Sequence, residues 1–277
     1  MYGRKKFILG TGETSMEYKN LLSVIAEQYK QILNENLVGI YVHGSIAFGC
    51  FNRYRSDIDF IVVINNPISK QIKLQLLQVL LNLSDKAPPN NFEMSVVLKK
   101  YCQKFIYPTP YELHYSDGYF ERHSKNPLLL CYDAPQYDPD LAAHFTVIVN
   151  TGIVLCGEPI SEIFGDIPKE HYLDSIRKDI ENAKENALDY PVYYVLNLCR
   201  VYAYMKDGLV LSKEKGGQWG MANLPEKYHS LIDAALGNYV KDTIFCKDEA
   251  LQIDFCEYML NLIFNPTVPA FSSANNF

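Results

Sequence analysis

Two aspartates in the first half of the chain have the spacing of a metal and phosphate site. Asp57 and Asp59 stand at i and i+2 at the start of a long apolar run. On a strand such a pair projects to one face, with Cα atoms about 6.5 Å apart. Two ionised carboxylates on an apolar strand repel each other and resist loss of water, so we expect a cation to neutralise them. Carboxylate oxygens and substrate phosphates are the ligands that Mg²⁺ prefers.

Gly44 and Ser45 precede this pair, and Glu93 follows it. Gly44 lets the backbone approach a ligand at a predicted turn, where Ser45 can hydrogen-bond to phosphate oxygens. Glu93 interrupts an apolar run whose other members alternate on the opposite face. Three carboxylates on neighbouring strands could hold a two-metal clamp for displacement at phosphorus. A lone Asp-x-Asp pair is more often a solvated edge, and Glu93 could face outward, so the hypothesis depends on the whole constellation.

The elements that must position these residues are predicted from the spacing of apolar side chains. Residues 15–34 and 68–83 have the periodicity of amphipathic helices. Residues 38–42, 56–64 and 92–98 are apolar and rich in β-branched side chains, which is typical of strands. The order helix, strand, strand, helix, strand predicts a domain with a small mixed α/β sheet.

Near residue 157 the character of the chain changes, and helical periodicity dominates beyond it. We therefore predict an α/β domain with a small mixed sheet over residues 1–157 and an all-α helical bundle over residues 158–277. Pro191 is expected to begin a helix that ends at Asp207 and Gly208. The other helical segments predicted in this part are residues 173–187, 225–240 and 247–264.

Composition limits the class of protein. The 277 residues include 26 Lys and Arg against 32 Asp and Glu, a formal net charge of −6, which disfavours a nucleic-acid partner. No apolar run approaches the roughly 20 residues that span a bilayer, and residues 1–13 have too short an apolar stretch for a signal peptide. The seven cysteines are scattered without a C-x-x-C pair, which suggests reduced thiols. We expect a monomeric, cytoplasmic protein without a membrane partner.

At the Gly-Ser and Asp-x-Asp motifs the chain resembles the nucleotidyltransferase superfamily. More closely, it is similar to the aminoglycoside O-adenylyltransferases that modify streptomycin and spectinomycin. The likeness extends over nearly the whole chain. Beyond the carboxylate segments, it is carried by residues 107–113, 138–142 and 195–200 and by Gly208, Lys213, Trp219, Leu224 and Pro225.

The resemblance implies transfer of AMP from ATP to a hydroxyl of an aminoglycoside or aminocyclitol antibiotic, spectinomycin or streptomycin. Pyrophosphate would be released, and antibiotic resistance would result. Asp57 and Asp59 would hold Mg²⁺, and Glu93 would complete the metal site and act as general base. The residues that the resemblance assigns to ATP binding are Gly44, Ser45, Ser56, Asp140, Arg200, Lys213 and Tyr258. Cations from the helical domain suit a triphosphate and the charge that develops at phosphorus, so the two domains would close on ATP.

Several of these residues also have a purely structural interpretation. Asp140 follows Asp138 and Pro139 at the start of a predicted helix, with Asp138 at the capping position, and could serve only that helix. Arg200 could form an ordinary surface ion pair, and Tyr258 shares a helical face with apolar residues. Trp219 fits an anchor of the helical bundle better than a substrate contact.

The family pattern breaks on the acceptor side. Residues 114–122 lack the tryptophan that family members use against the antibiotic, and Tyr119 could replace it. The acidic stretch before the Arg200 helix is altered in residues 185–190. The reaction type is therefore better supported than the acceptor. The alternatives are transfer to a lincosamide or a protein side chain, or a non-catalytic, antitoxin-like nucleotide-binding scaffold. A polymerase acting on RNA is disfavoured because no basic, aromatic-rich groove is visible.

Overall fold

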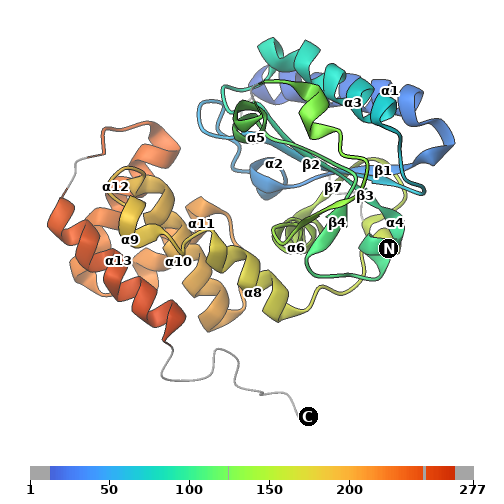
Figure 1. Ribbon diagram of the computed structural model, residues 1–277. Helices are drawn as coiled ribbons and strands as arrows, with labels where there is room; N and C mark the ends of the chain where they lie inside the picture. Colours follow the sequence, from blue (N-terminus) through green and yellow to red (C-terminus); the bar gives the residue numbers. More distant parts are fainter. Residues whose placement is uncertain (1–12, 124, 246–247, 266–277) are drawn as a thin grey trace, which may run out of the picture. The chain divides into compact units, whose positions relative to one another are not determined.

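The computed structural model describes residues 13–265 except 124, 246 and 247, and the chain forms two compact units (Figure 1). Unit 1 extends from Met1 to Pro168 and unit 2 from Lys169 to Phe277. The strand β7 ends at Gly157, where the sequence predicts the domain boundary, and the short helix α7 (Ile160–Ile163) still packs into the core of unit 1. The boundary after residue 157 therefore stays a prediction.

Unit 1 is built on a five-stranded mixed sheet with the order β5-β3-β2-β1-β7. Only β2 and β3 pair in parallel; the other neighbours in this sheet are antiparallel. The strands are β1 (Leu37–Val42), β2 (Ile58–Ile64), β3 (Phe92–Leu98), β5 (Leu113–Tyr115) and β7 (Ile153–Gly157). A separate antiparallel pair joins β4 (Thr109–Tyr111) to β6 (Gln136–Asp138). The mixed sheet agrees with the predicted order of elements, to which the structure adds β4, β5, β6 and β7.

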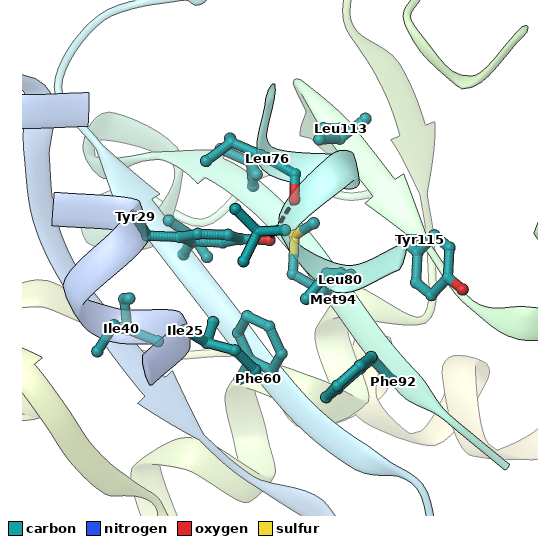
Figure 2. Close-up of a cluster of buried hydrophobic side chains, with 14 of the residues drawn as sticks. Ile25, Tyr29, Ile40, Phe60, Leu76, Leu80, Phe92, Met94, Leu113 and Tyr115 are labelled. Atoms are coloured by element: carbon teal, nitrogen blue, oxygen red, sulfur yellow. Dashed lines mark hydrogen bonds between the residues drawn. The ribbon is translucent and has the colours of Figure 1, made fainter. Parts of the chain in front are cut away.

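Helices cover both faces of this sheet (Figure 1). On one face, α1 (Glu13–Leu33) and α3 (Lys70–Leu83) bury apolar side chains against the strands, and Tyr29 donates a hydrogen bond of 3.1 Å to the Leu76 carbonyl (Figure 2). On the other face, α6 (Leu141–Thr151) contributes Leu141, Phe145 and Ile148 to a second core. The remaining α-helices in the described part of unit 1 are α2 (Gly44–Phe48), α4 (Lys99–Gln103), α5 (Asp117–Arg122) and α7.

Alternation along β3 supplies both cores. Phe92, Met94 and Val96 enter the core under α1 and α3, whereas Val97 enters the core under α6. Side chains on a strand alternate between faces, so Glu93 lies on the α6 side of the sheet. The predicted alternation is therefore confirmed.

Unit 2 is helical over its described residues. Its helices are α8 (Lys169–Lys178), α9 (Ala183–Asn186), α10 (Pro191–Asp207), α11 (Lys213–Asn223), α12 (His229–Lys241) and α13 (Glu249–Phe264). α10 begins at Pro191 and ends at Asp207, and Gly208 follows in the left-handed conformation with φ of 69°, as predicted. The periodic segment 173–187 is two helices, α8 and α9, separated by turns at 179–182. Its apolar face is nevertheless buried.

α11 is absent from the predicted elements because its sequence contains three glycines, which disfavour helix. In the structure these glycines allow close packing against neighbouring helices. A Cβ on Gly217 would lie 2.7 Å from side-chain atoms of Leu196 and of Leu236, and one on Gly220 would lie 2.7 Å from the Cys199 sulfur. The glycines are therefore placed by packing, and they do not mark a loop.

Three predictions concern the cysteines, a signal peptide and membrane-spanning segments. Six of the seven cysteines lie in the described residues, and no disulfide joins them there; Cys246 lies outside the described residues. The N-terminal segment in which we predict no signal peptide also lies largely outside them. Among the helices that are described, none combines the length and apolar character needed to cross a bilayer.

A buried ion pair connects α3 to the segment between β4 and β5. The Lys73 ammonium lies 3.3 Å from the Glu112 carboxylate and donates a hydrogen bond of 2.9 Å to the carbonyl of Tyr132. The two charged side chains are only 1% and 4% exposed. Loss of either charge would leave the other buried without its counterion, which is strongly unfavourable.

We predict that Lys73→Met lowers the free energy of unfolding by about 3 kcal/mol, because the Glu112 charge and the Tyr132 carbonyl lose their buried partner. Lys70→Met is the matched control: Lys70 is on the same helix and pairs with Asp133 at 2.8 Å, but the two side chains are 55% and 84% exposed. A pair so exposed contributes about 0–1 kcal/mol. Urea denaturation followed by circular dichroism measures both; equal losses would contradict the prediction.

Candidate active site

The register of two strands brings three carboxylates together. β2 and β3 pair in parallel with Asp59 opposite Glu93, and Asp57 lies immediately before the first residue of β2. One oxygen from each of the three carboxylates lies within 4.8 Å of the others. The strand begins two residues later than predicted, so Asp57 lies just before the strand while Asp59 belongs to it. The predicted cluster forms all the same.

Gly44 and Ser45 begin α2, a helix of five residues in place of the predicted turn. Gly44 has φ of 58°, and a Cβ on it would collide with the Asp59 carboxylate, so only glycine fits this position. The His43 amide donates a hydrogen bond of 3.0 Å to the Asp59 carbonyl and fixes the start of α2 to β2. The Ser45 hydroxyl oxygen is buried and has no hydrogen-bond partner among the described residues. Such a hydroxyl fits a phosphate oxygen.

A histidine of α6 lies beside the cluster, and the sequence analysis missed it. The Nε2 of His144 lies 3.3 Å from an Asp140 oxygen and 3.8 Å from a Glu93 oxygen. Its ring packs against the buried ring of His43, with centroids 4.6 Å apart and the planes tilted by 39°. The available signal was the i, i+4 spacing of Asp140 and His144 at the start of an apolar helix, which places both on one helical face.

Burial and like charge alter the acid–base properties of the cluster. Burial, with the nearby charges of Asp57 and Asp140, raises the pKa of Glu93 to about 7, although His144 opposes this shift. Burial lowers the pKa of His144, but Asp140 and Glu93 outweigh burial and raise it to about 10. The pKa of His43 is lowered by burial, so this ring is neutral. The acids thus gather more negative charge than one imidazolium neutralises.

The donor set fits a hard divalent cation. Asp57, Asp59 and Glu93 offer only carboxylate oxygens, which Mg²⁺ prefers, and the partnerless Ser45 hydroxyl stands at the adjoining helix. A cation between the carboxylates would also relieve the repulsion that raises the pKa of Glu93. The residues present are therefore suited to Mg²⁺.

The other predicted ATP-binding residues fall into two groups. In unit 1, Ser56 is buried and its hydroxyl accepts a hydrogen bond of 3.0 Å from the Asn52 amide, which closes the loop before Asp57. Asp140 is the N-cap residue of α6, but its side chain accepts no capping hydrogen bond and instead contacts His144. Asp138, the predicted cap, ends β6 and accepts a hydrogen bond from the Asp140 amide.

The second group belongs to unit 2. Arg200 forms an ion pair of 3.1 Å with Asp179, and the two side chains are 18% and 28% exposed. The Lys213 ammonium lies over the Tyr193 ring, 5.1 Å from its centroid. The ring of Tyr258 packs against that of Tyr228 at 5.1 Å. The contribution of Arg200, Lys213 and Tyr258 to nucleotide binding stays a prediction.

The Trp219 indole, for which the sequence favours an anchoring role, donates a hydrogen bond of 2.7 Å to Asp207 and packs edge-on against Tyr202. These contacts join α11 to α10, so Trp219 has a structural role in unit 2.

Aromatic side chains extend from the Glu93 face of β3 toward α5. Ser95, two residues beyond Glu93, forms a hydrogen bond of 2.9 Å with Nδ1 of His114. The His114 ring packs edge-on against Tyr119, whose hydroxyl lies 3.1 Å from that of Tyr132. Tyr119, the residue predicted to replace the family tryptophan, is therefore connected through packed side chains to the strand that carries Glu93.

Comparison with known proteins agrees with this geometry. Residues 22–107 match the family model of the nucleotidyltransferase domain, and residues 162–261 match that of the C-terminal domain of aminoglycoside adenylyltransferases. The first match contains Gly44, Ser45 and all three clustered carboxylates, and unit 1 contains a nucleotidyltransferase domain. The two matches together confirm the predicted resemblance to the aminoglycoside adenylyltransferases.

Individual relatives cover most of the chain. The spectinomycin 9-adenylyltransferase of Staphylococcus aureus is 25% identical over 217 residues, 76% of this chain and 80% of that protein. The spectinomycin 9-adenylyltransferase of Enterococcus faecalis is 23% identical over 264 residues, 90% of this chain and 95% of that protein. The crystal structure of spectinomycin adenyltransferase AAD(9) from Enterococcus faecalis with ATP and spectinomycin has a TM-score of 0.75 at 21% identity. It covers 88% of this chain and 98% of that one, and the predicted fold class is confirmed.

We predict that Gly44→Ala destabilises the protein more than Gly49→Ala by about 1–3 kcal/mol, because the added methyl group overpacks against Asp59. Gly49 is the matched control, since it also has a positive φ, 74°, but a Cβ there meets nothing within 4 Å. Both substitutions carry the cost of a left-handed alanine, about 1 kcal/mol. Equal losses in urea denaturation would show that the Gly44 site is roomier than the structure indicates.

Proposed function

We propose that this protein transfers AMP from ATP to a hydroxyl of spectinomycin. The observation that carries the proposal is the cluster of Asp57, Asp59 and Glu93 beside the Ser45 hydroxyl. Spectinomycin is the preferred acceptor because the named relatives are spectinomycin 9-adenylyltransferases. Streptomycin is the second acceptor to be tested.

Asp57, Asp59 and Glu93 would hold Mg²⁺. When bound, the cation would neutralise charge on the phosphates and stabilise the charge that develops at phosphorus. The Ser45 hydroxyl, buried without a partner among the described residues, would donate a hydrogen bond to a phosphate oxygen. Asp140, which lies near Glu93 in a second group with His144, would contact the nucleotide and help to orient it.

Glu93 would act as the general base. Its carboxylate accepts the proton of the acceptor hydroxyl while the hydroxyl oxygen forms a bond to the α-phosphorus of ATP. The bond from that phosphorus to the bridging oxygen of the β-phosphate breaks, and pyrophosphate leaves with the electron pair. Burial raises the pKa of Glu93 to about 7 in the absence of a metal, and a bound cation would lower it, so the carboxylate would be deprotonated and able to accept the proton at neutral pH.

Arg200 and Lys213 would supply positive charge to the triphosphate. Both are held by neighbours within unit 2, Arg200 by Asp179 and Lys213 by the ring of Tyr193. Cations fixed in advance bind phosphate with a smaller loss of side-chain entropy. On the acceptor side, Tyr119 would offer an aromatic surface in place of the family tryptophan.

The test is an AMP-transfer assay with full-length protein and ATP labelled at the α-phosphate. The acceptors are spectinomycin, streptomycin and a lincosamide, each with Mg²⁺ and with a chelator in place of Mg²⁺. We expect labelled, mass-shifted spectinomycin and release of pyrophosphate, both abolished by the chelator. Transfer to the lincosamide alone, or to no acceptor despite ATP binding, would overturn the proposal and favour another acceptor or a binding scaffold.

We predict that Glu93→Gln lowers kcat for AMP transfer by at least about 100-fold, because the amide cannot accept the hydroxyl proton. The variant should fold, since it removes a charge from a crowded acidic cluster. Glu35→Gln, at an exposed glutamate of the same unit, is the control and should leave kcat unchanged. Steady-state kinetics with circular dichroism of each variant makes the comparison; full activity of Glu93→Gln would exclude Glu93 as the base.

A further inference from the structure

We propose that Glu93, Asp140 and His144 form a second cation site, distinct from the Asp57, Asp59 and Glu93 cluster, that takes a borderline transition metal such as Zn²⁺. The three side chains come from β3 and from the start of α6. One ligand atom from each lies within 4.8 Å of the other two. Both clusters contain Glu93, and each has two further members: Asp57 and Asp59 in the first, Asp140 and His144 in the second.

The distances within this group fit a coordinated metal. The Nε2 of His144 lies 3.3 Å from Oδ2 of Asp140 and 3.8 Å from Oε1 of Glu93. Two ligands that bind one tetrahedral Zn²⁺ at about 2.0–2.1 Å are themselves about 3.3 Å apart. The first distance already matches this separation, and the second requires a movement of about half an ångström, which a side-chain rotation supplies.

The chemistry of the donors separates the two sites. Asp57, Asp59 and Glu93 present oxygen alone, which suits Mg²⁺, whereas an imidazole nitrogen beside two carboxylates favours Zn²⁺ and its neighbours in the transition series. His144 is 12% exposed, and its ring lies against that of His43 at an angle of 39°, which holds the ring in place. Nε2 releases its proton to solvent before it binds the metal. Three protein ligands would leave a coordination position for water or a phosphate oxygen.

One feature of the site limits its affinity. A histidine that binds metal usually donates its other ring N–H to an acceptor, and loss of such a partner costs about 10–100-fold in affinity. The Nδ1 of His144 has no hydrogen-bond partner among the described residues. We therefore expect reversible binding that responds to the concentration of free metal, in contrast to a permanent structural site.

Because both clusters contain Glu93, a metal in the second site would affect the AMP-transfer reaction. This part of the inference rests on the proposed function. A Zn²⁺ ion held by Glu93, Asp140 and His144 withdraws the Glu93 carboxylate from Mg²⁺ and from the acceptor proton. Zn²⁺ should then inhibit AMP transfer in competition with Mg²⁺. The binding itself requires neither ATP nor the acceptor and can be tested without activity.

The binding test is nuclear magnetic resonance of full-length protein with ¹⁵N-labelled histidine rings, titrated with Zn²⁺ without nucleotide. We expect a large shift of the His144 Nε2 resonance, assigned by its absence in His144→Phe. That variant keeps a planar ring against His43 and should weaken Zn²⁺ binding by at least about 100-fold, because it removes a metal ligand. A titration in which the His144 resonance does not move would overturn the proposal.

Asp57→Asn is the reciprocal control, because it weakens the oxygen-only cluster and leaves all three proposed Zn²⁺ ligands in place. The His144 shift should persist in this variant. Loss of Zn²⁺ binding in Asp57→Asn together with retention in His144→Phe would assign Zn²⁺ to the other cluster and refute the second site.

The competition is tested in wild-type protein by measuring inhibition by Zn²⁺ at several concentrations of Mg²⁺. We expect the Zn²⁺ concentration for half-inhibition to rise in proportion as Mg²⁺ increases. Zn²⁺ that binds His144 without inhibiting, or inhibits equally at every Mg²⁺ concentration, would refute the sharing of Glu93. A protein without AMP transfer would refute the proposed function, while the resonance titration would still decide the metal site.

Discussion

The parallel pairing of β2 with β3 is the constraint on which the site depends. This register sets Asp59 opposite Glu93, so two acids lie side by side on strands that otherwise contribute mostly apolar side chains to the two cores. Their mutual repulsion opposes the pairing. The apolar side chains of β2 and β3 enter both cores and hold the strands in register against that repulsion. The strands therefore keep the two carboxylates close together despite their repulsion, and a bound cation would reduce that repulsion.

The crowding of the carboxylates also determines which residues can surround them. Glycine is required at position 44 because the Asp59 carboxylate occupies the space of a side chain, and α2 can begin only where that carboxylate allows. His144 approaches from α6 on the face that carries Glu93, where it supplies positive charge to two acids. The crowded carboxylates thus leave room only for glycine at position 44, and they favour a positively charged histidine at position 144.

The sequence predicted the parts of the protein that depend on local patterns. Alternation along residues 92–98 placed Glu93 opposite its apolar neighbours, and Pro191 and Gly208 marked the ends of α10. It missed what depends on packing: the helix α11, whose glycines lie against Leu196, Leu236 and Cys199, and the approach of His144 to Glu93. Periodicity over residues 173–187 predicted burial correctly, but it gave no sign of the turns that divide the segment, since both helices keep their apolar face inward.

Charge is divided between the two units in a way that bears on the proposed reaction. The clustered acids belong to unit 1, whereas Arg200 and Lys213 belong to unit 2 and are held there by Asp179 and Tyr193. An acidic cluster attracts Mg²⁺ but repels a bare triphosphate, so under the proposed function metal and nucleotide would favour each other's binding. The proposal assigns the remaining phosphate charge to Arg200 and Lys213. The division therefore concerns particular side chains: the clustered acids that would hold the metal belong to unit 1, and the two cations that the proposed function assigns to the triphosphate belong to unit 2.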